Sequence, residues 1–258
     1  MLEVANGDAR LVVLPEHGGV LSSFALGDVE LLRTPDDDAG GAHWGCFVMA
    51  PWAGRTRHGR FTFEGVDHQL TCDSGPHAIH GTVRHQPWTV ERLSSDSVAL
   101  SCPFGPGWPF PGHVEHTIRV HPDHVAFELA LHSEAGPMPA VGGWHPWWRR
   151  PVHVDLPART MLRRDAEGIT TEERVSPIPP GPWDDCFTDL TGPPVLRWPG
   201  GVELTIESDC GWVVVYDEPA ESVCVEPQSG PPDALNHHPA VASPGHPVVI
   251  RSAWRWRP

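Results

Sequence analysis

Short stretches in which apolar and polar residues alternate recur along the whole chain. Alternation with a period of two places one side of an extended strand in a core and the other in solvent, whereas an amphipathic helix has a period near 3.6. Strands are therefore predicted at residues 60–64, 113–120, 124–132, 202–206, 212–216 and 248–256. Turn-forming residues separate these stretches, as in Glu64-Gly65-Val66-Asp67 and His121-Pro122-Asp123.

The chain shows no window of helical length with a helical apolar period. Its 30 prolines and 26 glycines are spread over the whole length, which disfavours long helices. We predict an all-β fold, a large twisted β-sandwich, that forms a single domain over residues 1–258. The proline-rich stretch 176–182 is interpreted as a surface loop rather than a linker.

The charge balance excludes several classes of partner and of chemistry. The 18 basic residues are all arginine and face 33 acidic residues, which gives a formal net charge of −15. Such a surface repels phosphate backbones and anionic lipids, so we expect no nucleic-acid partner and no membrane partner. The absence of lysine excludes catalysis through a lysine Schiff base and phosphate binding by a phosphate-loop lysine.

The cysteines and the N-terminal stretch favour a cytoplasmic protein. The six cysteines include no CxxC pair and are expected to be reduced core residues. No basic leader followed by an apolar stretch begins the sequence, and no run approaches 18 apolar residues. We therefore expect neither secretion through a signal peptide nor a membrane span.

Four segments, supported by a fifth, carry the chemistry. In chain order they are residues 51–61 (PWAGRTRHGRF), 79–81 (IHG), 143–148 (GWHPWW), 183–187 (WDDCF) and 223–236 (VCVEPQSGPPDALN). In this order and at these separations they resemble the aldose 1-epimerase, or galactose mutarotase, family. The last segment is the most specific of them. The resemblance implies the galactose mutarotase-like supersandwich fold and a sugar substrate.

The resemblance also implies roles for six residues. Glu226 is similar to the family's general base and His145 to its proton donor, and His80 belongs to the same catalytic pocket. Arg55 and Asp184 align with sugar-binding residues, and Trp147 offers an aromatic face for stacking on a sugar. Gly54 stands where the family has asparagine, and Asp185 is the neighbour with which Asp184 is most easily confused.

The implied reaction interconverts the α and β anomers of a free aldohexose. A base takes the proton of the anomeric hydroxyl while an acid protonates the ring oxygen, and the aldehyde then recloses on its other face. Positioned proton transfers each contribute about 10²–10⁴-fold, so no cofactor or metal is expected. We expect Glu226 to lie at a strand end, held extended by Pro227, where burial raises its pKa toward that of a useful base.

Three alternatives remain open from the sequence. A hexose-phosphate mutarotase would need an arginine cluster at the pocket, for which the candidates are Arg55, Arg57, Arg149 and Arg150. A noncatalytic sugar-binding protein would account for the 12 tryptophans, and a metal-dependent isomerase could use the histidines, of which His77 and His80 are near one another. The expected partner is a small sugar, and the expected state a monomer or a homodimer.

Overall fold

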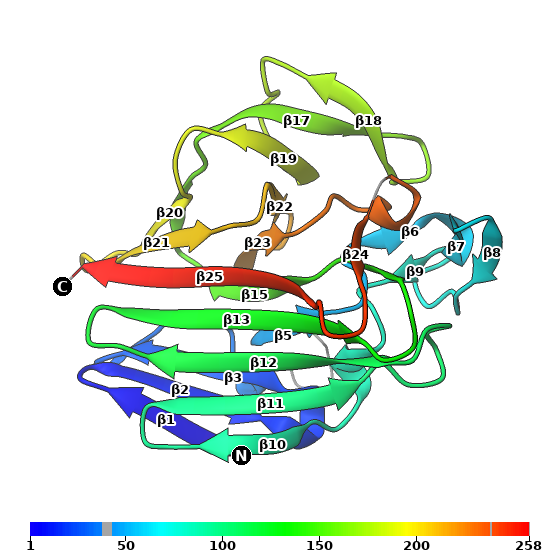
Figure 1. Cartoon of the computed structure of the whole chain (residues 1–258). Helices are drawn as coiled ribbons and strands as arrows, with labels where there is room; N and C mark the ends of the chain where they lie inside the picture. The colour runs from blue at the N-terminus through cyan, green and yellow to red at the C-terminus, as the bar shows by residue number, and fades with distance from the viewer. Residues whose placement is uncertain (38–42, 238, 258) are drawn as a thin grey trace.

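The computed structural model describes residues 1–37, 43–237 and 239–257, and its main element is an 11-stranded sheet (Figure 1). In spatial order its strands are β1 (Leu2–Asn6), β2 (Ala9–Leu14), β3 (Val20–Leu26), β5 (Cys46–Met49), β15 (Gly143–Arg149), β23 (Ser222–Gln228), β22 (Trp212–Tyr216), β19 (Asp184–Leu190), β17 (Ala158–Arg164) and β18 (Thr170–Val175), with β4 (Val29–Glu30) beside β3.

A second sheet of eight strands packs against part of the first (Figure 1). Its order is β10 (Thr89–Leu93), β11 (Ser97–Pro103), β12 (Gly112–Val120), β13 (His124–Ser133), β25 (Val248–Arg257), β21 (Glu203–Ser208), β20 (Val195–Arg197) and β16 (His153–Asp155). Three small two-stranded sheets complete the strands: β6 (Arg55–Thr56) with β9 (Ala78–Ile79), β7 (Arg60–Phe63) with β8 (Val66–Gln69), and β14 (Met138–Ala140) with β24 (Ala240–Ala242).

The helical elements of the described residues are five short 3-10 turns, namely η1 (Pro15–His17), η2 (Pro35–Asp37), η3 (Arg57–Gly59), η4 (Val83–His85) and η5 (Ala234–Asn236). The all-β sandwich prediction is confirmed, and each of the six predicted strands is present with its ends shifted by at most a few residues. Residues 176–182 lie outside strands, as predicted for a loop. No helix in the described part of the chain is long and apolar enough to cross a membrane.

The core lies between the two large sheets and follows the alternation read from the sequence. Along β12 every second residue is buried, from Val114 to Val120, because those side chains face the opposite sheet. Trp254 of β25 crosses the gap, with its ring 4.7 Å from that of Trp148 on β15 and 6.0 Å from that of Phe24 on β3. Aromatic packing therefore joins the smaller sheet to the strands that carry the candidate site.

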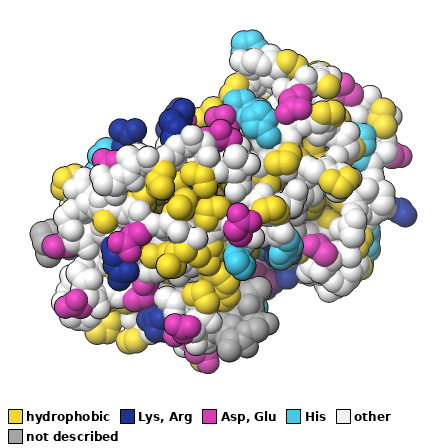
Figure 2. All heavy atoms as spheres, turned by 90° about the horizontal axis from the view of Figure 1, so that it is seen from below, with side chains coloured by type: hydrophobic (Ala, Val, Ile, Leu, Met, Phe, Trp, Pro, Cys, Tyr) yellow, Lys and Arg dark blue, Asp and Glu magenta, His cyan; other side chains and the backbone are white. Residues whose placement is uncertain are grey.

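The outer surface in Figure 2 mixes charged, histidine and apolar side chains. Basic side chains are scattered singly over this face, and apolar ones gather across its middle (Figure 2). Such a face has no basic patch of the kind that tracks a phosphate backbone.

Candidate active site

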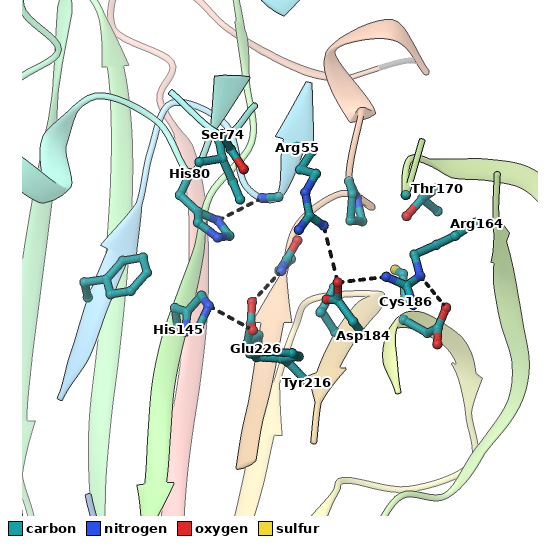
Figure 3. Close-up of a pocket in the computed structure, with 18 of the residues that line it drawn as sticks. Arg55, Ser74, His80, His145, Arg164, Thr170, Asp184, Cys186, Tyr216 and Glu226 are labelled. Atoms are coloured by element: carbon teal, nitrogen blue, oxygen red, sulfur yellow. Dashed lines mark hydrogen bonds and ion pairs between the residues drawn. The ribbon is translucent and has the colours of Figure 1, made fainter. Parts of the chain in front are cut away.

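A pocket of about 450 Å³ opens on one side of the larger sheet. Its floor comes from five adjacent strands, β5, β15, β23, β22 and β19, and its rim from β6, β9 and β17. All six residues assigned from the sequence line it: Arg55, His80, His145, Trp147, Asp184 and Glu226. The fold thus gathers side chains from positions 55 to 226, as Figure 3 shows for five of them.

The position of Glu226 differs from the one expected. The strand does not end at Glu226 but continues through Pro227 to Gln228, and its seven residues are all buried. Val213 of β22 pairs with Pro227 across one side of the strand. Proline has no N–H group to donate. Pro227 can therefore lie inside a central strand only if the strand on the other side, β15, does not require a hydrogen bond from this position.

The other side of β23 meets that condition through a second proline. The antiparallel register pairs Gly143 with Gln228 and Trp147 with Cys224, which places His145 opposite Glu226 midway between the two pairs. Pro146 and Pro227 flank this midpoint, and neither can donate a backbone hydrogen bond. We attribute the gap in the ladder to these prolines, and Glu226 and His145 lie opposite each other at that gap.

The tryptophan-rich strand β15 divides its side chains between two environments. His145 and Trp147 line the pocket, whereas Trp144 and Trp148 are fully buried on the other face. The Nε1–H group of Trp144 donates to Nε2 of His116 in the core at 3.2 Å. The period-two geometry of a strand therefore places both core tryptophans and pocket-lining residues in one short segment.

The rim is built where β6 and β9 pair, with Arg55 opposite Ile79. The next residue, His80, has a φ of 61°, and its Nδ1 accepts the N–H group of Gly54 at 3.3 Å. Gly54 itself has a φ of +67°, which glycine adopts without strain. A Cβ there would lie 2.7 Å from Pro232, so the asparagine of the family would not fit at this position.

Glu226 and His145 form a buried pair at the bottom of the pocket. Oε1 of Glu226 lies 3.2 Å from Nε2 of His145, and Oε2 accepts a hydrogen bond from Gln228 at 3.1 Å (Figure 3). Burial raises the pKa of Glu226 well above its ordinary value of 4.5, and the nearby carboxylate of Asp184 raises it further. Gln228 and Arg55 act in the opposite direction.

His145 is held by rings on neighbouring positions. It stacks on Phe47 of the adjacent strand at 4.5 Å between centroids and on Trp147 at 5.0 Å. Burial lowers the pKa of His145 to about 3, so the ring is neutral near pH 7, although the resemblance makes His145 the proton donor. Trp147, 4% exposed, supports His145 and has little free face for a sugar.

His80 has a fixed tautomer in its neutral state. Because a backbone N–H group can only donate, Nδ1 of His80 must carry the lone pair, and the ring proton lies on Nε2. Burial and the neighbouring His145 lower the pKa of His80 well below 6.5, which keeps the ring neutral. His80 is therefore a hydrogen-bond donor rather than a proton source.

Asp184 lies between two arginines on the far wall. Its Oδ2 is 3.4 Å from Nη1 of Arg55 and 2.8 Å from Nη1 of Arg164, whereas Asp185 contacts Nε of Arg164 at 3.0 Å (Figure 3). Both aspartates line the pocket, but only Asp184 contacts Arg55. This arrangement orients donors and acceptors that suit the hydroxyl groups of a sugar.

The arginines proposed from the sequence for a phosphate do not converge. Arg57 pairs with Asp165 and Glu167 outside the pocket, and Arg149 and Arg150 line a different hollow. Of the four, only Arg55 lines the candidate site.

Two further arginines line the pocket, and each has an acidic partner. Arg164 contacts Asp184 and Asp185, and Arg84 lies 3.2 Å from Asp73. The arginines of the pocket are thus balanced by carboxylates.

One buried group, which includes two residues of the pocket, has the composition of a metal site. His145, Cys224 and Glu226 each offer a donor atom within 4.8 Å of the others. Burial raises the pKa of the Cys224 thiol well above 9.0, which disfavours the thiolate that a metal needs. His77 contacts His58, not His80, and the pair considered from the sequence forms no three-donor group among the described residues.

Sequence reasoning missed several contributors to the site. Gln228 stands two residues after Glu226 on the same strand, so the period-two rule would have placed it on the same face. Phe47 stacks on His145 through strand pairing, and Arg164 reaches Asp184 from β17. No motif in the sequence marked either residue, because both depend on the order of strands in the sheet.

Comparisons with known proteins indicate the family of the chain. The family model described as aldose 1-epimerase matches residues 1–248. The uncharacterized protein YphB of Escherichia coli K12 is 23% identical over 268 residues, covering 91% of this chain and 89% of YphB.

Solved structures share the fold over nearly the whole chain. A putative aldose 1-epimerase from E. coli K12 superposes with a TM-score of 0.88 at 20% identity and covers 99% of this chain and 98% of that one. A GalM/aldose epimerase homologue from C. elegans gives 0.86 at 18% identity, covering 99% and 98%. The fold is thus the predicted galactose mutarotase-like sandwich. Because the family model spans nearly the whole length, the chain belongs to the aldose 1-epimerase family.

Proposed function

We propose that this protein is an aldose 1-epimerase that interconverts the α and β anomers of a free aldohexose. The observation that carries the proposal is the contact between Glu226 and His145, 3.2 Å apart and buried at the bottom of a sugar-sized pocket. The anomeric hydroxyl and the ring oxygen are both bonded to C1. A base and an acid this close can therefore serve both oxygens of one sugar.

The proton needed by the acid is already present in the pair. The pKa shifts of Glu226 and His145 favour a carboxylic acid beside a neutral imidazole. Transfer of that proton from Oε1 to Nε2 yields a carboxylate and an imidazolium without changing the net charge. The hydroxyls of a bound sugar would solvate both ions and so favour this form.

The reaction then follows from the two ionised groups. The carboxylate of Glu226 takes the proton of the anomeric hydroxyl, the C1–O5 bond breaks as the C1 carbonyl forms, and the imidazolium of His145 protonates O5. Rotation about C1–C2 presents the other face of the aldehyde, and the two groups exchange roles in ring closure. Nε2–H of His80 would donate to a sugar oxygen, while Arg55 and Asp184 orient the hydroxyls.

The pocket charges favour a neutral sugar over a hexose phosphate. Each of the arginines Arg55, Arg84 and Arg164 contacts an aspartate, so a phosphate dianion would have to compete with an existing ion pair. A noncatalytic sugar-binding protein would have no need for a buried acid and base in contact, because such burial costs free energy. We therefore favour a catalyst acting on free sugar.

The proposal is tested by the rate of anomer equilibration. Freshly dissolved α-anomers of several aldohexoses and hexose 6-phosphates are followed by polarimetry with a metal chelator present. We expect acceleration over buffer for at least one free aldohexose and little for the phosphates. Rates equal to buffer across the whole panel would refute the enzyme assignment, and acceleration confined to phosphates would refute the substrate class.

A further inference from the structure

Two histidines and a glutamate cluster on the outer face of the smaller sheet, away from the pocket. His113 and Glu115 belong to β12, and His132 belongs to the neighbouring strand β13 (Figure 1). Each offers one ligand atom, and these three atoms lie within 4.8 Å of one another. None of the three lines the candidate active site.

The strand register explains why the three side chains meet. His113 and His132 are direct cross-strand partners, so their side chains project from the same face of the sheet. Glu115 follows His113 by two positions and therefore shares that face. The two imidazole rings lie parallel, with 4.6 Å between centroids and 6° between planes.

The distances suit a small divalent cation after minor side-chain adjustment. Nitrogen and oxygen ligands about 2.1 Å from a tetrahedral Zn²⁺ lie about 3.4 Å from each other. Nε2 of His132 and Oε2 of Glu115 are 3.6 Å apart, close to that spacing. The remaining separations, at most 4.8 Å, need closure by about 1.4 Å or less, within the reach of rotation about side-chain bonds.

Glu134 gives His113 the protonation state that a metal ligand needs. Its Oε1 lies 3.0 Å from Nδ1 of His113. A carboxylate can only accept a hydrogen bond, so Nδ1 carries the proton and the lone pair of the ring lies on Nε2. Carboxylates commonly orient metal-binding histidines through this contact.

His132 supplies a second, independent indication. Its Nε2 atom is buried and has no hydrogen-bond partner among the described residues, although the ring as a whole is partly exposed. A buried ring nitrogen without a partner is costly, and a bound cation would satisfy it. The 3.6 Å separation from Glu115 is too long for a hydrogen bond.

We propose that His113, Glu115 and His132 form a binding site for one divalent transition-metal ion of the Zn²⁺ class, with Glu134 orienting His113. The imidazole and carboxylate donors match the preferences of Zn²⁺. Solvent supplies the fourth ligand, because the cluster lies at the sheet surface. The site is separate from the proposed epimerase reaction and does not depend on it.

The test is a Zn²⁺ titration of the full chain at pH 7.5 by calorimetry, with a chromophoric chelator as competitor. We expect one zinc ion per chain, with affinity at least tenfold weaker in His132→Ala and in Glu115→Gln. Glu134→Ala should weaken binding about tenfold, in the range known for such supporting carboxylates. Binding should also weaken on acidification, because a metal requires unprotonated imidazole.

Two controls keep the result specific. His121 and His124 also form a stacked histidine pair, 4.2 Å apart, but belong to no three-donor group in the described chain, so His121→Ala should bind zinc as the wild type does. Glu226→Gln removes a donor from the pocket and should also leave zinc binding unchanged. Circular dichroism of His132→Ala reports whether the variant is folded. Absence of zinc binding by the wild type, equal affinity in His132→Ala, or loss of binding only in Glu226→Gln would each overturn the proposal.

Discussion

Replacing Glu226 with glutamine should make the protein more stable at neutral pH. The buried carboxyl has a pKa raised well above 4.5 by burial and by Asp184, so the ionised form is disfavoured in the folded protein. Glutamine keeps the shape of the protonated acid. It can donate to Nε2 of His145 and accept from Gln228, which preserves both contacts of the wild-type side chain.

The size of the effect follows from proton linkage. Below pH 4.5 the carboxyl is protonated in the folded and unfolded chains alike, and its contribution to stability is fully present. Above that pH the unfolded chain releases the proton while the folded chain keeps it. The wild type therefore loses about 1.4 kcal/mol per pH unit relative to Glu226→Gln, until the pH passes the folded-state pKa and the difference becomes constant.

Urea denaturation of both proteins at intervals from pH 4 to pH 9 measures this difference directly. Subtracting the two curves cancels the other titrating groups, which the variants share. Glu16→Gln, at an exposed position, reports the effect of removing a carboxylate from the surface. A pH-independent difference between Glu226→Gln and the wild type would refute the argument that burial holds the proton on Glu226.

Three further predictions follow from the site and its rim. Asp184→Asn removes a charge that raises the pKa of Glu226, so the alkaline limb of kcat/KM should move to lower pH, with most of the kinetic loss in KM. Gln228→Leu removes a hydrogen bond that lowers the same pKa, and should move that limb to higher pH; both shifts are read from pH–rate profiles, and unmoved limbs would contradict the coupling. Gly81→Ala should destabilise several times more than Gly65→Ala in urea denaturation. Both glycines have positive φ, a conformation that costs alanine about 1 kcal/mol. A Cβ at Gly81 would also lie 1.9 Å from the carbonyl oxygen of Ala50, whereas a Cβ at Gly65 would meet open space. Equal losses of stability in the two variants would show that the structure relaxes around the Gly81 contact.

The all-β fold was predictable because the pattern that indicates each strand lies within a short stretch of sequence. Alternation along single strands depends only on which side chains face the core, as the buried positions of β12 show. The order of strands is a different matter. Strand β17 lies beside β19, and this neighbour relation brings Arg164 to Asp184, although neither sequence segment indicates the other.

The candidate site was predictable in the segments whose sequence motifs accompany an unusual backbone conformation. Gly54 and His80 take positive φ values, and their segments contain the residues that resemble the family. The expected strand end at Glu226 was wrong because a proline ordinarily ends pairing. Here Pro227 still pairs with β22, and only the pairing with β15 is interrupted, between Pro146 and Pro227. The sequence does not show that these two prolines lie near each other on adjacent strands.

The protonation state of His145 could not be predicted from the sequence, because it depends on burial. A histidine in a motif suggests titration near neutral pH. The structure encloses this one between Phe47, Trp147 and Glu226, and burial lowers its pKa to about 3. The acid is therefore assigned to the pair rather than to the histidine alone.

The most direct test of the account is the rate of anomer exchange catalysed by the Glu226→Gln variant. The sugar is an aldohexose that the wild type accepts as a substrate. Exchange between its α and β anomers is measured at equilibrium by NMR for the wild type, Glu226→Gln and Asp184→Asn. If Glu226 is the base, its replacement should lower kcat by about 10²–10⁴-fold with little change in KM, because the isostere binds but cannot accept a proton. Near-wild-type turnover of Glu226→Gln, together with loss of activity in Asp184→Asn, would show that the base is the other carboxylate.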